Sequence, residues 1–266
     1  MGKITKALRA LGQIVKRPYL LNLILDSEEV WKDYVVKHYN LTDGLPCIDF
    51  HQFLPAGGME VKPFAFLDGG SLPTDLALLK SLSLRNNVRD YMEIGTWRGE
   101  SVANVAATGA HCVTINLPDE EMRKMGMPED YIRIHRHFSE NTPNILHVQA
   151  HSHHFDFNSL NKKFDLIFID GDHHSDSITK DTRTAFSLLK DENSVIVWHD
   201  YALSPETPRF EVLSGILNGC PEEHRKHLYH VSNTLCAIFT RERFEAKALQ
   251  PNRKPEKVFK IIVESI

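Results

Sequence analysis

The segment YMEIGTWRGES, from Tyr91 to Ser101, most constrains how this chain can fold. An apolar run that ends on Glu93 is followed by a turn through Gly95 and Gly99, and a helical pattern starts near Ser101. Glycines permit a tight turn and the close approach of a ligand, and the first turn of the following helix points free amide groups at that ligand. The segment is therefore typical of a strand–turn–helix unit that cradles a nucleotide.

The glycine spacing narrows the class of nucleotide. The pattern Glu-x-Gly-x-x-x-Gly lacks the third glycine of the dinucleotide fingerprint, which argues against a nicotinamide or flavin dehydrogenase. A Rossmann-type oxidoreductase or nucleotide-sugar enzyme would usually also show a Tyr-x-x-x-Lys pair, and the chain has none. A plain strand–turn–helix of any doubly wound domain stays open as the simpler alternative.

Beyond residue 70, apolar strand patterns alternate with helical ones. We predict strands over 88–95, 111–117, 145–151, 164–170 and 194–200, and helices over 74–84, 100–108 and 177–189. Residues 228–234 and 235–241 are close enough to pair as an antiparallel hairpin, and 257–265 could add an edge strand or a helix. The alternation predicts an α/β, Rossmann-like, doubly wound domain over 71–266. Its sheet would be mostly parallel and seven-stranded with an antiparallel last strand, and residues 1–70 would form a helical and loop extension.

Two of the predicted strands end in acids and imidazoles: FDLIFIDGDHH (164–174) and SVIVWHDY (194–201). The carboxyl ends of parallel strands meet at one edge of a sheet, which is where ligands bind in open α/β folds. We therefore expect Asp170, His199 and Asp200 to converge. Their oxygen and nitrogen atoms form a ligand set suited to a divalent cation.

The glycine turn, with Glu93, Gly95 and Gly99, resembles that of class I S-adenosylmethionine-dependent methyltransferases. The pairing of DGDH with HDY resembles a group of sugar, macrolide and small-molecule O-methyltransferases related to catechol-type enzymes. The resemblance covers about 71–241. It implies S-adenosylmethionine as cofactor and a hydroxyl of a glycan or other small molecule as methyl acceptor.

The resemblance also implies residue roles. Asp170 and Asp200 would bind Mg²⁺ or another divalent cation, with His199 as a ligand or a neighbour, and Asp170 would also take part in catalysis with His173 as the general base. The implied cofactor-binding residues are Glu93, Gly95, Thr96, Trp97, Gly99, Ser101, Asn116, His151 and Ser152. Asn116 replaces the family's usual acid after the second strand, although its amide can still accept and donate hydrogen bonds. The insertion over 119–140 could be a lid or an ordinary solvated helical face.

The first 40 residues differ in character from the rest. Ile4, Leu8 and Leu11 recur at helical spacing among lysines and arginines, which predicts a basic amphipathic helix, and 28–39 predicts a second helix. The first helix could lie on an anionic membrane surface, pack on the body of the protein or form a homo-oligomer interface.

Composition and charge argue against several other classes of protein. With 31 basic and 35 acidic residues the net charge is −4, so no nucleic-acid partner is expected. Four scattered cysteines without a CxxC pair suggest neither a zinc site nor a disulfide framework, which favours a cytoplasmic setting, at most peripheral to a membrane. A non-catalytic cofactor-binding scaffold, attached through the N-terminal helix, remains the alternative from a different class.

Overall fold

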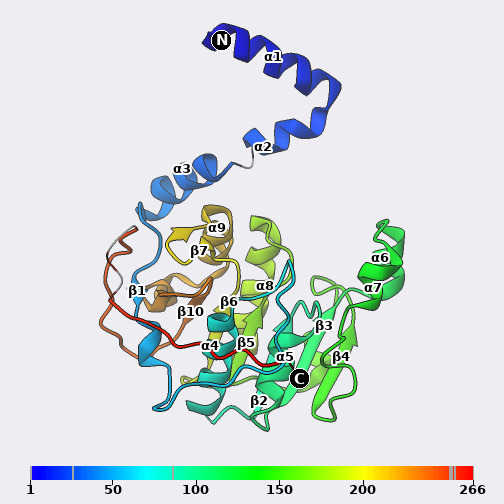
Figure 1. Cartoon of the computed structure of the whole chain (residues 1–266), viewed down its shortest axis with the longest axis vertical. Helices are drawn as coiled ribbons and strands as arrows, with labels where there is room; N and C mark the ends of the chain where they lie inside the picture. Colours follow the sequence, from blue (N-terminus) through cyan, green and yellow to red (C-terminus); the bar gives the residue numbers. More distant parts are fainter. Residues whose placement is uncertain (1, 26, 86, 252–253, 255, 266) are drawn as a thin grey trace.

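The computed structural model describes residues 2–25, 27–85, 87–251, 254 and 256–265, and an eight-stranded sheet forms its centre (Figure 1). The strand order is β1-β9-β10-β6-β5-β2-β3-β4. The strands are β1 (Cys47–Ile48), β2 (Asp90–Ile94), β3 (His111–Asn116), β4 (Ile145–Gln149), β5 (Leu166–Ile169), β6 (Val195–Trp198), β9 (Leu228–Val231) and β10 (Ala237–Phe239). A separate small sheet pairs β7 (Ala202–Ser204) with β8 (Thr207–Pro208).

The middle of the large sheet is parallel. β2 lies between β3 and β5 and runs parallel to both, while β6 follows β5 and β4 follows β3 in the same direction. β10 is antiparallel to both of its neighbours, β6 and β9. The predicted mostly parallel, doubly wound sheet with an antiparallel last strand is confirmed, and so is the hairpin that completes it.

The sheet has one strand more than the seven predicted. β1 pairs parallel with β9, and Cys47 also forms an antiparallel bridge to Lys247. A two-residue strand is too short to leave a readable alternation of polar and apolar residues, so the sequence pattern could not indicate it. A segment that precedes residue 71 thus completes one edge of the sheet.

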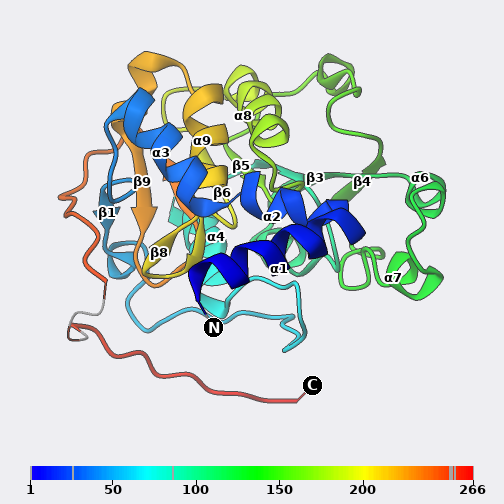
Figure 2. The same cartoon turned by 90° about the horizontal axis from the view of Figure 1, so that it is seen from above.

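Helices cover both faces of the sheet (Figure 2). Successive residues of a strand point to opposite faces. In β2, Met92 and Ile94 therefore enter the apolar cluster under α8, α9 and α3, whereas Tyr91 enters the cluster under α4 and α5. These helices are α3 (Glu28–Tyr39), α4 (Pro73–Arg85), α5 (Glu100–Ala106), α8 (Ser175–Leu188) and α9 (Phe210–Gly219).

The sequence patterns anticipated α3, α4, α5 and α8 but not α9. Gly215 and Gly219 let α9 approach α8 closely, since a Cβ at Gly215 would lie 2.7 Å from Cβ of Ile178. On its other side, the amide of Phe210 donates to Oε2 of Glu28 in α3 at 2.6 Å. Because α9 is buried nearly all round, it lacks the polar face by which an amphipathic helix is recognised.

The remaining helices are short or lie at the N-terminus. They are α1 (Lys3–Lys16), α2 (Asn22–Leu25), α6 (Asp119–Lys124), α7 (Glu129–Arg133) and the 3₁₀ turns η1 (Pro18–Leu21), η2 (Phe50–Gln52), η3 (Phe157–Leu160) and η4 (Glu222–His227). The helix predicted at the N-terminus is confirmed as α1, whereas 257–265 forms neither the strand nor the helix considered for it. Across the described ranges, none of the helices has the length and apolar character needed to span a membrane.

Candidate active site

The glycine turn lies directly against the end of β5. Gly95 has a φ of 92°, and a Cβ there would come within 2.0 Å of the carbonyl oxygen of Asp170. Gly99 has a φ of 83°, and a Cβ there would lie 2.2 Å from Oγ of Ser139. Both positions therefore need glycine for backbone conformation and for space. Their contact with a cofactor stays a prediction.

Glu93, the acid of this motif, is fully buried at the end of β2. The hydroxyl of Tyr91 donates to its Oε2 at 2.6 Å. Burial raises the pKa of Glu93 to about 8, although the hydroxyls of Tyr91, Ser101 and Thr114 partly oppose that rise. Its Oε1 receives no hydrogen bond of normal geometry from the described residues. The carboxyl is thus held beside Ser101 of α5 with one oxygen unsatisfied.

We expect Glu93→Gln to remove a pH dependence of folding stability. The folded protein keeps a proton on Glu93 up to about pH 8, whereas the unfolded chain releases it near pH 4.5, so stability falls as the pH rises through this window. Each pKa unit corresponds to about 1.4 kcal/mol, so the loss amounts to several kcal/mol. Urea unfolding across this pH range should show a flatter profile for Glu93→Gln. The exposed control Glu120→Gln should keep the wild-type slope, and an unchanged slope in Glu93→Gln would contradict the expectation.

Thr96 and Asn116 lie next to each other at the carboxyl ends of β2 and β3. The Thr96 hydroxyl pairs with that of Thr114 at 2.5 Å, and the Thr96 amide points at Oδ1 of Asn116 at 3.5 Å. The structure therefore brings Asn116, predicted to contact a ribose, to the glycine turn.

Trp97 joins the glycine turn to the insertion over 119–140. Its backbone has a φ of 43°, which is unusual for a residue other than glycine. Its ring packs on Tyr131 and His135, with ring centroids 4.5 and 5.0 Å apart, and its carbonyl accepts from the amide of Arg136 at 2.7 Å. The insertion thus rests on the turn.

His151 and Ser152 follow β4, as predicted; Ser152 contacts α8, and His151 lies against two neighbouring histidines. The ring of His151 lies 4.9 Å from those of His153 and His154, and the Ser152 hydroxyl hydrogen-bonds Asp181. Burial raises the pKa of Asp181 to about 6, against that hydrogen bond. The structure does not bring these two residues into described contact with Glu93 or the two glycines, so their cofactor role stays a prediction.

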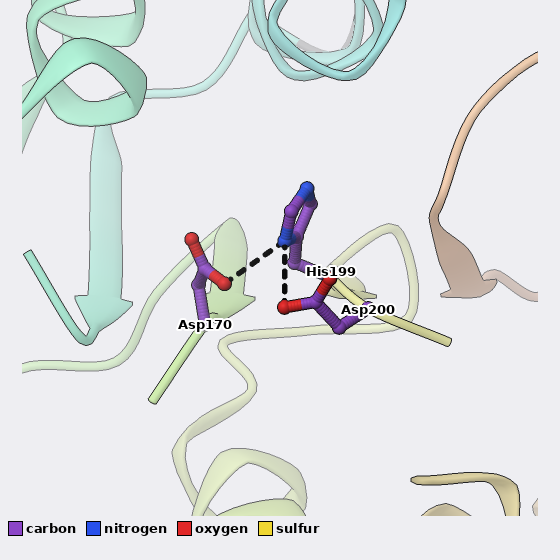
Figure 3. Close-up of side chains that lie close together, drawn as sticks. All are labelled: Asp170, His199 and Asp200. Atoms are coloured by element: carbon purple, nitrogen blue, oxygen red, sulfur yellow. Dashed lines mark ion pairs between the residues drawn. The ribbon is translucent and has the colours of Figure 1, made fainter. Parts of the chain in front are cut away.

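Asp170, His199 and Asp200 converge where β5 and β6 end (Figure 3). Nδ1 of His199 lies 3.0 Å from Oδ1 of Asp170 and 3.2 Å from Oδ2 of Asp200. The two strands pair side by side, with Ile169 opposite Trp198, which carries the following residues to one point. The sequence-predicted cluster is therefore present as a group of side chains.

The charges within the cluster shift the pKa values of His199 and Asp200 strongly. Burial would lower the pKa of His199, but Asp170, Asp200 and a third carboxylate raise it well above its ordinary value. Burial likewise opposes ionisation of Asp200, yet His199, His173 and Arg209 lower its pKa to about 2. Asp200 also has a φ of 52°. Strained backbone of this kind persists only where the surroundings enforce it, and it gathers at functional sites.

The third carboxylate belongs to Asp75 in α4, which the sequence analysis did not single out. Asp75 is fully buried, and its Oδ2 lies 3.1 Å from Nε2 of His199. The same carboxylate accepts the amides of Leu72 at 2.7 Å and Leu235 at 2.8 Å. Asp75 therefore holds the imidazole with Nδ1 toward Asp170 and Asp200. Only the general rule that a ligating histidine has a carboxylate or carbonyl on its other nitrogen could have prompted a search for it.

His173 lies at the open side of the cluster. Its Nε2 is 3.2 Å from Oδ2 of Asp200, and 41% of its side chain is exposed. Asp172, next to it in sequence, does not join the group, because it accepts hydrogen bonds from Ser177 and from the amide of His174. The structure thus places His173, and not Asp172, beside Asp200.

The donor set fits a divalent cation. Nδ1 of His199 is buried and makes no aligned hydrogen bond, although two carboxylate oxygens lie within 3.2 Å of it. Two carboxylates and one imidazole are hard to intermediate ligands of the kind that Mg²⁺ and Mn²⁺ accept. Asp170 and Asp200 are 21% and 26% exposed, so an ion could reach them.

Comparison with solved structures finds distant similarities. The chain resembles the SAH-bound methyltransferase PaMTH1 of Podospora anserina, with 16% identity and a TM-score of 0.44, over 68% of this chain and 83% of that one. It also resembles an O-methyltransferase from Bacillus cereus in complex with SAH, with 17% identity and a TM-score of 0.43, over 80% of this chain and all of the other. No curated protein matches the chain.

A family model described as a methyltransferase domain matches residues 92–201. This segment holds the glycine turn, the insertion and both acid-terminated strands. The resemblance to methyltransferases drawn from the sequence is confirmed for residues 92–201, which are similar to a methyltransferase domain.

Proposed function

We propose that this protein transfers the methyl group of S-adenosylmethionine to a hydroxyl of a small-molecule or glycan acceptor, with a divalent cation at the site. The observation that carries the proposal is the convergence of Asp170, His199 and Asp200 beside the glycine turn. Because a Cβ at Gly95 would strike the Asp170 carbonyl, turn and cluster share one edge of the sheet. A methyl donor held by the turn would lie next to an acceptor held by the cluster.

Two features of the turn support the cofactor. The acid that the resemblance assigns to the methionine end, Glu93, has an Oε1 without a hydrogen bond of normal geometry among the described residues. A ligand ammonium group that approached this carboxyl would favour its ionised form, against the burial that keeps it neutral. Asn116, which the amide of Thr96 faces, offers an amide to the ribose hydroxyls.

Asp170, His199 and Asp200 would hold the cation. When bound, such an ion lowers the pKa of an acceptor hydroxyl and fixes its orientation. Asp75 contributes by holding the ring of His199, so that Nδ1 is already oriented toward the two acids and needs only to lose its proton to act as a ligand.

His173 is suited to take the proton of the acceptor. Because its Nε2 faces Asp200, the carboxylate stabilises an N–H at that atom and leaves Nδ1 as the basic nitrogen. Nδ1 of His173 would take the proton of the acceptor hydroxyl as the acceptor oxygen bonds to the methyl carbon and the bond from that carbon to sulfur breaks.

Calorimetric titration with S-adenosylhomocysteine, with magnesium and then with chelator, tests the proposal. We expect micromolar binding in both conditions, with tighter binding or a separate magnesium signal when the cation is present. Binding without any magnesium effect would remove the metal and keep the methyltransferase. Absence of binding in every condition would overturn the proposed function and favour a scaffold or a nucleotide-sugar enzyme.

A further inference from the structure

Helix α1 carries an apolar stripe that the rest of the protein leaves uncovered. Ile4, Leu8, Leu11 and Val15 follow each other at spacings of four, three and four residues, which places them on one helical face. Their exposed fractions are 77%, 66%, 58% and 80%, and no residue of α1 is buried. The sequence alternative in which this helix packs on the body of the protein is therefore not what the structure shows.

More exposed apolar side chains follow α1 along the chain. The 3₁₀ turn η1 and helix α2 add further exposed apolar side chains, which are Tyr19, Leu21, Leu23, Ile24 and Leu25. Figure 1 shows α1 and α2 standing clear of the sheet, with α3 as the first helix that lies against the body. An uncovered apolar surface of this extent marks an interaction site rather than ordinary surface variation.

The same segment is strongly basic. Residues 2–25 contain five basic and no acidic residues, whereas the whole chain has a net charge of −4, so the remainder is acidic. At about 100° per residue, Lys3 and Lys16 flank the apolar stripe while Lys6 and Arg9 lie on the far side of the helix. Positive charge thus borders the stripe on both edges.

We propose that residues 3–25 dock the protein on the surface of an anionic lipid bilayer. A bilayer interface is layered, with acidic headgroups above acyl chains, so the apolar stripe can insert while the flanking lysines reach the headgroups. α1 has this arrangement, with apolar side chains on one face and Lys3 and Lys16 at the edges of that face. The inference does not depend on the proposed methyl transfer.

A second copy of the chain fits this surface less well. Pairing two apolar stripes would bring Lys3 and Lys16 of one copy to the rim of the other, where residues 2–25 supply no acid to pair with them. Docking the cations on the acidic body of another copy would instead leave the stripe in water. Only the bilayer satisfies both faces of the helix at once.

Flotation of the full-length protein with lipid vesicles tests the proposal. We expect it to float with vesicles of phosphatidylcholine mixed with phosphatidylglycerol, and much less with phosphatidylcholine alone or at high salt. The variant Lys3→Gln/Lys16→Gln, which removes the two lysines that flank the stripe, should lower the partition coefficient by at least about tenfold. Leu8→Glu/Leu11→Glu should abolish binding to both kinds of vesicle.

The matched control is Leu84→Glu/Met125→Glu, which places the same charges at apolar positions that are 51% and 65% exposed elsewhere on the surface. It should float like the wild type, and circular dichroism should show all variants folded. Unchanged flotation of Leu8→Glu/Leu11→Glu would overturn the proposal. Absence of flotation of the wild-type protein would overturn it as well. A dimer that Leu8→Glu/Leu11→Glu converts to monomer, without flotation, would assign the stripe to a second copy.

Discussion

Replacing either acid of the cluster should abolish the binding of a divalent cation. Asp170→Asn and Asp200→Asn each remove a negative charge within 3.2 Å of Nδ1 of His199 while keeping the side-chain shape. We expect the affinity for Mn²⁺ to fall by at least about a hundredfold, since changes in the groups that merely support a ligand already cost up to about that factor. Calorimetry with Mn²⁺ measures this directly and needs no methyl acceptor.

Asp172→Asn is the matched control. Asp172 lies two residues from Asp170 in the same loop, but its oxygens accept from Ser177 and from the amide of His174. Its variant should bind Mn²⁺ like the wild type. All three variants should still bind S-adenosylhomocysteine. Wild-type Mn²⁺ affinity in Asp170→Asn and Asp200→Asn would show that the cluster holds no cation, whereas methyl transfer could still stand.

Gly95→Ala should be the most damaging small substitution in the glycine turn. At a φ of 92° the added Cβ would lie 2.0 Å from the carbonyl oxygen of Asp170 and 2.9 Å from Cα of Gly171, and backbone atoms cannot yield as a flexible side chain can. The turn and the end of β5 must therefore separate. We expect a loss of at least about 2 kcal/mol in the free energy of unfolding, beyond the conformational strain itself. Binding of S-adenosylhomocysteine should be lost with it.

Gly109→Ala separates the effect of backbone strain from the effect of the steric clash. Gly109 has nearly the same φ, 93°, but a Cβ there meets nothing within 4 Å. Its variant should show only the strain of a left-handed residue, about 1 kcal/mol, and should retain cofactor binding. Urea unfolding of both variants gives the comparison. An equal loss of unfolding free energy in Gly95→Ala and Gly109→Ala would mean that the turn can move away from β5 at little cost.

The acids at the carboxyl ends of the central strands could be predicted from the sequence, because local sequence pattern determines where these strands end. β2, β5 and β6 are short apolar runs bounded by polar residues, and the parallel order of such strands carries Glu93, Asp170 and Asp200 to one edge. The glycine turn was predictable for the same reason, since a positive φ and a close approach both demand glycine at that point of the chain.

Other parts of the fold leave no local signal. β1 has two residues and exists because β9 and Lys247 offer it partners. α9 is a helix buried on nearly all sides, so it has no amphipathic period to recognise. Both are stabilised by neighbours that lie far away along the chain.

Within the site, Asp75 is another feature that local sequence pattern could not predict. Its carboxylate reaches His199 across 124 residues of sequence, from a helix whose pattern says only that it begins near Pro73. No spacing rule joins the two residues. Likewise, the sequence predicted an amphipathic α1, but only the structure shows that its apolar face stays uncovered.

The sequence by itself determined the strand–helix alternation, the glycine turn and the acids that end β5 and β6, because these depend on side-chain periodicity and backbone geometry over a few residues. The tertiary structure decided the eighth strand, the packing of the insertion on Trp97, the role of Asp75 and the exposure of α1. Those features depend on which surfaces meet once the core is packed, and contacts between distant segments are set by shape and burial rather than by local pattern.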